Sequence, residues 1–415
     1  MRRHWRTLIA GVALSLAGEA SSLAGEASPQ DFTEIERGRY LAILSDCASC
    51  HTVPESNQPF AGGRAIETPF GNIVAPNITP DPETGIGSWS DDAFDAAVRK
   101  GLQPDGSHLF PAMPYNAYSE MSRDDVLAIR AYLNTVTPVH NAVVADMLPF
   151  PFNIRAAMIV WNALYSTEGE YQRDPHKSDE WNRGAFLVQG PGHCGACHTG
   201  KTFLGGDKTS QYLKGAYLQG WSAPNVTNNA RLGVGAWSQE DLVAYLKSGH
   251  NRVTAATGPM AEVVTLSTSL MTESDLNAIA IYLKSLSGEE TQPTALPKDD
   301  VAMATGGAVY RDQCSACHGL DGRGVAELFP SVADSPMVRA DDATTSIRIV
   351  LRGARSVDTS TAPTAPGMPS YGQQLDDTEI AAVLTYIRNS WGNPAIAVKA
   401  ADVAKVRQET ALRPD

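Results

Sequence analysis

The chain has 415 residues and a mass of 44.3 kDa, which exceeds a single small module and allows about two to four domains. Hydrophobic residues make up 43% and charged residues 19%, so the chain can bury real cores and its composition argues against wholesale disorder. With 33 Lys and Arg against 46 Asp and Glu, the net charge of -13 argues against nucleic acid as a partner.

The first 27 residues are predicted to be a secretory signal peptide. Three arginines among the first six residues precede the apolar run Leu8 to Ala17 and then small residues, an order typical of export signals. The heptapeptide SLAGEAS occurs twice in succession, so cleavage after Ala20 and after Ala27 both stay open. An uncleaved anchor is the alternative, but the apolar run is much shorter than the ~20 residues that span a bilayer.

All six cysteines belong to C-x-x-C-H sequences, the pattern of covalent c-type haem attachment. The three motifs comprise Cys47, Cys50 and His51, then Cys194, Cys197 and His198, then Cys314, Cys317 and His318. Cysteines three positions apart lie on one helical face, where both can form thioethers with porphyrin vinyl groups and the adjacent histidine can reach the iron. Chance would produce about 0.002 such pentapeptides in this chain, so we predict three covalently bound haem c groups.

Other uses of paired cysteines fit this pattern less well. A four-ligand zinc site normally takes two pairs close in sequence, whereas these pairs lie more than 100 residues apart. A thioredoxin-like redox motif and structural disulfides both leave unexplained why a histidine follows every pair.

Internal repeats divide the chain into tandem units. The block at Ala75 (APNIT) matches the block at Ala223 (APNVT), and Trp89 matches Trp237, all at a constant offset of 148 residues. The third unit lacks these blocks and is a more distant relative. We therefore expect an all-α fold with three tandem cytochrome c-like haem domains. The expected limits are a signal peptide 1–27, a first domain 31–140, a linker with an apolar helix 141–178, a second domain 179–287, a linker 288–300, a third domain 301–393 and a polar tail 394–415.

Helix signals follow the repeats. Mid-domain helices are predicted over 90–101 and 238–249, because each range begins with a serine N-cap and ends with a glycine. Closing helices with one apolar face are predicted to start near Ser122, Thr272 and Asp376. No strong alternating pattern typical of strands competes with these signals.

An electron-transfer haem needs a second iron ligand, and cytochromes c typically place a methionine opposite the histidine. The candidates are Met113, Met260 and Met368. The first two each follow the histidine of their motif by 62 residues, and the third follows by 50. Neighbouring prolines are typical of an irregular loop held over a haem face. Core packing is the alternative for each methionine, and we predict iron ligation by all three.

Four further side chains are candidates for contact with haem propionates. Trp89 and Trp237 can each donate an indole N–H, with packing against the ring edge as the alternative. Arg37 and Arg183 can form ion pairs with propionates, with a solvated position on a helix as the alternative.

The chain resembles the tri-haem cytochrome c subunit of the membrane-bound dehydrogenases of acetic acid bacteria and their relatives. The resemblance covers about residues 31–393. Besides the haem motifs, it rests on the blocks Asn77 to Pro82, Pro111 to Tyr115, Gly190 to Cys194 and Gly258 to Ala261. It implies a periplasmic complex in which a catalytic subunit carrying pyrroloquinoline quinone (PQQ) or FAD oxidises an alcohol, aldehyde, sugar, polyol or sugar acid. This chain would then pass electrons through its haems to ubiquinone, and a small third subunit would be a further partner.

The resemblance also implies association with the periplasmic face of the cytoplasmic membrane. Some relatives end in a transmembrane anchor, whereas the carboxyl end here is polar, so we expect membrane contact to be peripheral or through a partner. The segment Met147 to Tyr165 is the best candidate for contact with the membrane surface or with a partner. A buried interdomain helix is the alternative for this segment.

Two other classes of function stay open. A haem peroxidase would need an open iron position and a distal acid–base group, and three candidate methionine ligands argue against it. A freestanding multihaem carrier that feeds a terminal oxidase would need no dehydrogenase partner. We find no nucleotide-binding glycine fingerprint and no catalytic triad pattern, and therefore expect the site of substrate oxidation to lie on another chain.

Overall fold

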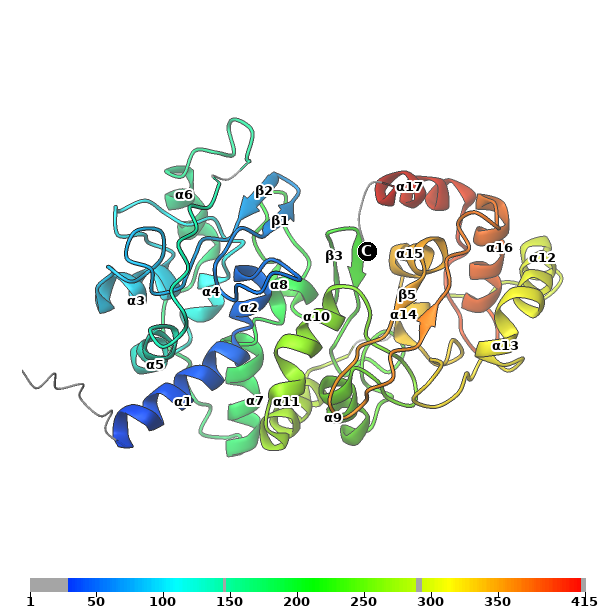
Figure 1. The fold of residues 1–415 in the computed structure, drawn as a ribbon. Helices are drawn as coiled ribbons and strands as arrows, with labels where there is room; N and C mark the ends of the chain where they lie inside the picture. Colours follow the sequence, from blue (N-terminus) through cyan, green and yellow to red (C-terminus); the bar gives the residue numbers. More distant parts are fainter. Residues whose placement is uncertain (1–28, 145–146, 289–292, 412–415) are drawn as a thin grey trace, which may run out of the picture.

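The structure, a computed structural model of the chain, describes residues 29–144, 147–288 and 293–411. The predicted signal peptide and both of its candidate cleavage positions lie outside these residues. We call residues 29–144 the first unit, 179–288 the second unit and 293–411 the third unit. The first and third units lie at opposite ends of the molecule, with much of the second between them (Figure 1).

The first unit contains five helices and one hairpin. These are α1 (Pro29–Leu44), α2 (Cys47–His51), β1 (Ala65–Thr68), β2 (Gly71–Val74), α3 (Asp91–Lys100), α4 (Tyr115–Tyr118) and α5 (Arg123–Leu133). Helix α6 (Ala157–Tyr165) lies in the segment that leads to the second unit.

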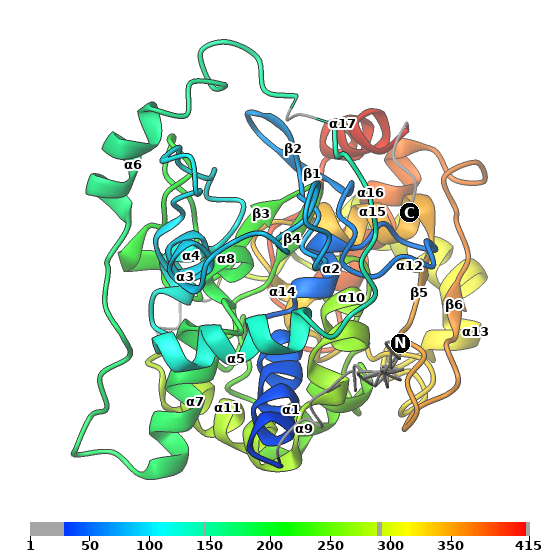
Figure 2. The same cartoon turned by 60° about the vertical axis from the view of Figure 1, so that its left-hand side comes forward.

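The second unit repeats much of this order. Its elements are α7 (Asp179–Gln189), α8 (Gly195–His198), η1 (Thr209–Gln211), β3 (Ala216–Leu218), β4 (Trp221–Ala223), α9 (Gln239–Ser248), α10 (Pro259–Leu266), η2 (Thr268–Leu270) and α11 (Glu273–Ser285). Helices α1, α7 and α11 lie side by side in both views (Figures 1 and 2).

The third unit departs most from the other two. Its elements are α12 (Val301–Val309), the π-helical turn η3 (Tyr310–Cys314), α13 (Ser315–His318), α14 (Pro336–Arg339), α15 (Thr344–Arg352), β5 (Ala354–Arg355), β6 (Gly367–Met368), α16 (Asp377–Arg388) and α17 (Ala400–Thr410). Helix α17 packs on α15 and α16. Val403 and Val406 of α17 are buried there, so the segment expected to be a polar tail contributes to the core of this unit.

The predicted helix limits are confirmed. Each predicted N-cap side chain accepts a hydrogen bond from a backbone N–H in the first turn of its helix. These caps are Ser90 of α3, Ser122 of α5, Ser238 of α9, Thr272 of α11 and Asp376 of α16. Gly101 and Gly249 end α3 and α9 with left-handed φ angles of 61° and 76°. Only glycine adopts this conformation without strain.

The all-α expectation is wrong in one respect, because each unit carries a two-stranded antiparallel hairpin. Strands of two to four residues are too short for an alternating pattern to stand out. In the second hairpin Leu218 pairs with Trp221, and the two turn residues, Gln219 and Gly220, both have positive φ. Gln-Gly is not among the usual signals for such a turn, so sequence rules missed it.

In each unit the helix before the attachment motif crosses the closing helix at a glycine. A Cβ added to these glycines would lie 1.7 to 2.0 Å from a backbone carbonyl oxygen of the closing helix. The glycine and carbonyl pairs are Gly38 and Ala128, Gly184 and Ala278, and Gly306 and Ala382. The helix backbones therefore touch, and no side chain fits between them.

The first two units share one hydrophobic core. Fully buried Leu44 and Met121 of the first unit belong to the same cluster as Leu187 and Leu276 of the second. The third unit has cores of its own, one between α15, α16 and α17 and another around Tyr310. Within the described residues, no helix combines the length and apolar character that crossing a membrane requires.

Candidate haem-binding sites

The histidine of every C-x-x-C-H motif is held by the carbonyl of a proline. The Nδ1 to oxygen distances are 2.8 Å for His51 and Pro76, 2.7 Å for His198 and Pro224, and 2.9 Å for His318 and Pro330. A carbonyl only accepts, so Nδ1 carries the proton in each ring. This tautomer leaves the lone pair on Nε2, which is the form that binds a metal.

These rings are also held neutral. Desolvation lowers the pKa of His51, His198 and His318 and outweighs the bond to the carbonyl, which acts in the opposite direction. A neutral imidazole is the form that binds iron, so both the tautomer and the charge of the three rings suit metal ligation.

The repeated Ala-Pro-Asn blocks position two of the three carbonyls. Asn77 Oδ1 accepts hydrogen bonds from the backbone N–H and the hydroxyl of Thr79 at 2.9 and 2.8 Å. Asn225 does the same for Thr227 at 2.7 and 2.8 Å. In the third unit Ser331 takes this place, with its hydroxyl accepting from the N–H two residues on. Sequence reasoning used these blocks only as repeat markers and missed their role, although a proline recurs 25 and 26 residues after the first two histidines.

A glycine with positive φ closes the loop after each motif. Its N–H donates to the carbonyl of the motif histidine at 2.8 to 2.9 Å. The pairs are Gly62 and His51, Gly215 and His198, and Gly324 and His318. A Cβ at these glycines would lie 2.2 to 2.9 Å from backbone atoms near the histidine-binding proline, so glycine is required at this close approach.

No disulfide joins any of the six cysteines, all of which lie within the described residues. Burial raises the pKa of Cys47 and Cys194 to about 12 and that of Cys197 and Cys314 to about 11. A thioredoxin-like redox pair requires the opposite shift, so the thiol environment argues against that alternative. Within the described residues, no cluster of three or more His, Cys, Asp and Glu side chains is arranged to hold a metal ion.

The three candidate methionines are all half-buried. Met113 lies in an irregular turn before α4 and packs against the shared core, as expected for a loop ligand. The loop prediction is wrong for the other two. Met260 lies in the first turn of α10, because Pro259 has the fixed φ that suits the start of a helix. Met368 lies in β6, where it pairs with Ala354.

The arginines proposed for propionates are engaged elsewhere. Arg37 pairs with Asp125 at 2.5 Å, and Arg183 forms two bonds of 2.8 Å with Asp275. Both acids lie in the first turn of the closing helix, which the helix crossing brings against the arginine. The two arginine side chains are still 49% and 39% exposed, so each lies at the surface of its helix while it pairs with the acid. Each ion pair holds the helix before the attachment motif against the closing helix.

The first and second attachment sites are neighbours. Helix α10 of the second unit contacts α2 of the first. Glu262 of α10 forms an ion pair with Arg64, whose other contact is the carbonyl of Ser49 inside the first motif. Burial raises the pKa of Cys197, and the neighbouring Cys50 adds to that shift. The two motifs are therefore held within electrostatic range of each other.

A stacked ring pair joins the same two sites. Tyr118 of α4 stacks on His193, which directly precedes Cys194, with ring centroids 5.5 Å apart. The buried Tyr118 hydroxyl donates to the carbonyl of Ser45 at 2.7 Å. The third attachment site is more open, because Cys317 is exposed and Leu320 beside it is 71% exposed.

The chain is similar to known cytochrome c proteins. A family model described as Cytochrome c matches residues 35–137 and 303–391. The chain is 40% identical over 400 residues to the gluconate 2-dehydrogenase cytochrome c subunit of Pantoea cypripedii, covering 91% of this chain and 90% of that protein. The chain belongs to the family of dehydrogenase cytochrome c subunits.

The chain is also similar to two further cytochrome c subunits. One is the cytochrome c subunit of the quinone alcohol dehydrogenase of Gluconobacter oxydans (strain 621H), with 40% identity over 90% of this chain and 82% of that protein. The other is the fructose dehydrogenase cytochrome subunit of Gluconobacter japonicus, with 37% identity over 90% and 82%. The resemblance drawn from the motifs is confirmed.

Cytochrome c domains carry covalently attached haem c, and the residues present fit that group. Neutral histidines with an available Nε2 follow each cysteine pair, as described above. In addition, Trp237 is 7% exposed and its indole Nε1 has no hydrogen-bond partner among the described residues. A haem propionate would satisfy such a buried donor.

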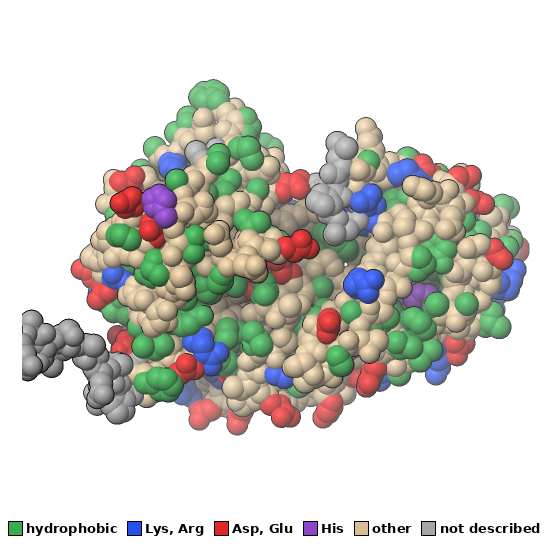
Figure 3. Space-filling model, in the orientation of Figure 1, with side chains coloured by type: hydrophobic (Ala, Val, Ile, Leu, Met, Phe, Trp, Pro, Cys, Tyr) green, Lys and Arg blue, Asp and Glu red, His purple; other side chains and the backbone are tan. Residues whose placement is uncertain are grey.

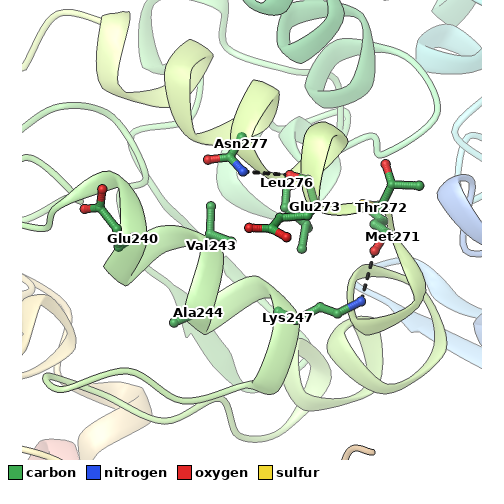
Figure 4. A pocket seen from close by; sticks show the side chains of 9 residues that line it. All are labelled: Glu240, Val243, Ala244, Lys247, Met271, Thr272, Glu273, Leu276 and Asn277. Carbon is green, nitrogen blue, oxygen red and sulfur yellow. Dashed lines mark hydrogen bonds between the residues drawn. The ribbon is translucent and has the colours of Figure 1, made fainter. Parts of the chain in front are cut away.

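The second unit also has a surface hollow. It occupies about 550 Å³ between α9 and α11 (Figure 4). Its lysine, Lys247, donates to the carbonyls of Ser269 and Met271 at 2.6 and 3.0 Å, and Asn277 donates to the carbonyl of Glu273. None of the residues lining it is a predicted haem ligand or attachment cysteine.

Proposed function

We propose that this chain is the electron-transfer subunit of a periplasmic, membrane-associated dehydrogenase complex. It carries three haem c groups in tandem domains over 31–140, 179–287 and 301–393. The observation that carries this proposal is the histidine-to-proline bond, which recurs at all three motifs although the sequences around the third differ from the rest.

The protein's part in the chemistry is to hold and tune each iron. When bound, haem iron alternates between the ferric and ferrous states and carries one electron at a time. The cysteines would hold the ring covalently, and His51, His198 and His318 would each bind an iron. Their bonds to proline carbonyls increase ligand basicity and fix ring orientation. Met113, Met260 and Met368 would each supply a thioether as the second iron ligand, which favours a higher potential than a second nitrogen ligand does.

The partners follow from the family. Its members serve gluconate, alcohol and fructose dehydrogenases, and the alcohol dehydrogenase is named as a quinone enzyme. We infer that a catalytic subunit carrying PQQ or FAD oxidises an alcohol, sugar, polyol or sugar acid and reduces this chain. Ubiquinone is the acceptor, and a small third subunit completes the complex. The signal peptide 1–27 directs the chain to the periplasm.

Mass spectrometry of the mature chain tests the haem count. We expect the processed polypeptide plus three haem masses when the chain is made in cells competent for cytochrome c maturation. Two or fewer haems would refute the tri-haem proposal.

Reconstitution tests the electron path. The subunit alone should be inert toward alcohols, sugars and sugar acids, and with its catalytic subunit it should be reduced by substrate and reoxidised by a ubiquinone analogue. Deletion of this chain should leave dye-linked activity in the catalytic subunit but abolish most quinone reduction. Full quinone reduction after the deletion would show that the haems serve another acceptor, and peroxide turnover by the subunit alone would favour a peroxidase.

A further inference from the structure

Exposed hydrophobic side chains gather in the segment after the first unit and in a loop of the second, and the bond from Trp161 to the carbonyl of Leu204 joins the two. Its large hydrophobic side chains are 42% to 92% exposed. We call the following nine residues the apolar tip: Met147, Phe150, Phe152, Ile154, Ile159, Val160, Leu164, Phe203 and Leu204. Contiguous apolar patches of this kind mark interaction sites, whereas single exposed hydrophobic residues are ordinary.

The apolar tip is presented on a rigid base. The opposite side of α6 is anchored by Trp161, which is 8% exposed, donates to the carbonyl of Leu204 at 3.0 Å and packs edge-on against Tyr115. The Tyr115 hydroxyl donates to Asn162 at 2.7 Å. Helix α6 is thus neither wholly buried nor loosely attached, and its outward side is held exposed.

The composition of the tip separates it from the rest of the surface. Between Met147 and Tyr165 the one charged residue is Arg155, in a chain that is 19% charged. The guanidinium of Arg155 lies 4.5 Å from the ring centroid of Phe110 and donates to the carbonyl of His108 at 2.9 Å. No acidic side chain of this segment would have to be desolvated or brought against anionic lipid.

The convex shape of the apolar tip favours a deformable partner, such as a lipid surface, over a folded protein. The loop before α6 forms the highest point of the molecule in Figure 1, and hydrophobic side chains cover that projection in Figure 3. A convex apolar projection needs a matching hollow in a protein partner, whereas a bilayer surface accommodates it directly, with aromatic residues at the level of the headgroups.

We propose that the apolar tip inserts into the surface of a phospholipid bilayer and so holds the haem units against the membrane. This inference rests on the proposed function only in placing the complex at a membrane. Because the net charge is -13, attraction to anionic lipid cannot drive the contact. Binding should therefore come from apolar insertion and depend little on salt or on anionic lipid content.

Vesicle flotation of the mature, haem-loaded chain tests the inference. We expect binding to phosphatidylcholine vesicles that changes little when phosphatidylglycerol or salt is added. Phe150→Ser combined with Val160→Ser should weaken binding about tenfold or more, since each side chain loses its apolar transfer energy. The matched control is Leu270→Ser combined with Val301→Ser, whose side chains are 54% and 80% exposed but lie outside the tip. This control should bind like the unmodified chain.

Three results would overturn the inference. The first is that the unmodified chain binds neither kind of vesicle. The second is that the tip variant binds as well as the unmodified chain. The third is that binding requires phosphatidylglycerol and disappears when salt is added. If the chain ignores vesicles while the tip variant loses its catalytic subunit, the tip is a protein interface. The haem count and reduction by the dehydrogenase should be unaffected by the tip variant, so failure of the proposed function would be seen separately.

Discussion

The helix crossing in the third unit allows a sharp test, because two adjacent glycines of α12 differ in what they face. A Cβ at Gly306 would lie 2.0 Å from the carbonyl oxygen of Ala382, where about 3.5 Å is a comfortable contact. A Cβ at Gly307 would meet the Tyr386 ring at 3.0 Å and the Arg311 guanidinium at 3.4 Å, both of them side chains that can move. Gly306→Ala and Gly307→Ala are therefore a matched pair.

The magnitudes follow from the two contacts. Overpacking costs about 1–3 kcal/mol or more, and a backbone obstacle places Gly306→Ala at the upper end. The better helix propensity of alanine returns about 1 kcal/mol, so we expect a net loss of about 2 kcal/mol in the free energy of unfolding of the third unit. For Gly307→Ala the same propensity gain opposes a small adjustment of Tyr386, and the change should stay within about 0.5 kcal/mol.

Urea unfolding of the haem-loaded chain provides the assay. The two larger cores of the third unit are separate from the shared core, and among the described residues only a small buried hydrophobic cluster of Ala256, Val264 and Val357 spans the second and third units, so we expect two transitions. Gly306→Ala should move only the transition in which the third haem loses its thioether-to-iron absorption. Equal effects of the two substitutions, or a shift of both transitions, would refute the described crossing and the independence of the third unit.

Further substitutions test the iron ligands, the turn that follows the histidine-binding Pro224, and a buried carboxyl group. Met113→Ala, Met260→Ala and Met368→Ala should each remove one haem's thioether-to-iron band and open one site for carbon monoxide; an unchanged spectrum would place that ligand elsewhere. Asn225→Ala removes the two hydrogen bonds that Asn225 accepts from Thr227 and should lower the free energy of unfolding, measured in urea, by about 1–3 kcal/mol. The control Asn228→Ala changes an exposed side chain and should leave this free energy nearly unchanged. Burial raises the pKa of Glu120 to about 7, so the folded state holds this proton more tightly than the unfolded chain, and the stability that it contributes should fall as pH rises from about 4.5 through 7. Glu120→Gln should flatten that part of the urea-midpoint profile, with the exposed Glu83→Gln as control.

Local signals in the sequence predict the helix limits correctly, because each signal depends on a few neighbouring residues. Ser90 and Ser238 cap helices through bonds that span three positions, and Gly101 and Gly249 end them by adopting positive φ. The C-x-x-C-H motifs are equally local, since their cysteines and histidine lie within one or two helical turns. Such rules need no knowledge of which segments later pack together.

Features set by tertiary contact were missed or wrongly assigned. The helix crossing places Asp125 beside Arg37, a contact between residues 88 positions apart that no local pattern indicates. Pro259 beside Met260 suggested a loop and instead begins a helix. The polar composition of 394–415 predicts a tail, whereas Val403 and Val406 recur with helical spacing and are buried on one face of α17.

The packing of the units imposes an asymmetry on the proposed relay. The first two attachment sites share one core, a Tyr118–His193 stack and the Arg64–Glu262 ion pair, so relative motion of their haems would disrupt buried contacts. The third site has its own core and an exposed Cys317. Solvent exposure and burial are levers by which a protein separates haem potentials. Two rigidly coupled sites and one open site therefore suit a path in which a close pair exchanges electrons internally and the third haem meets an external partner.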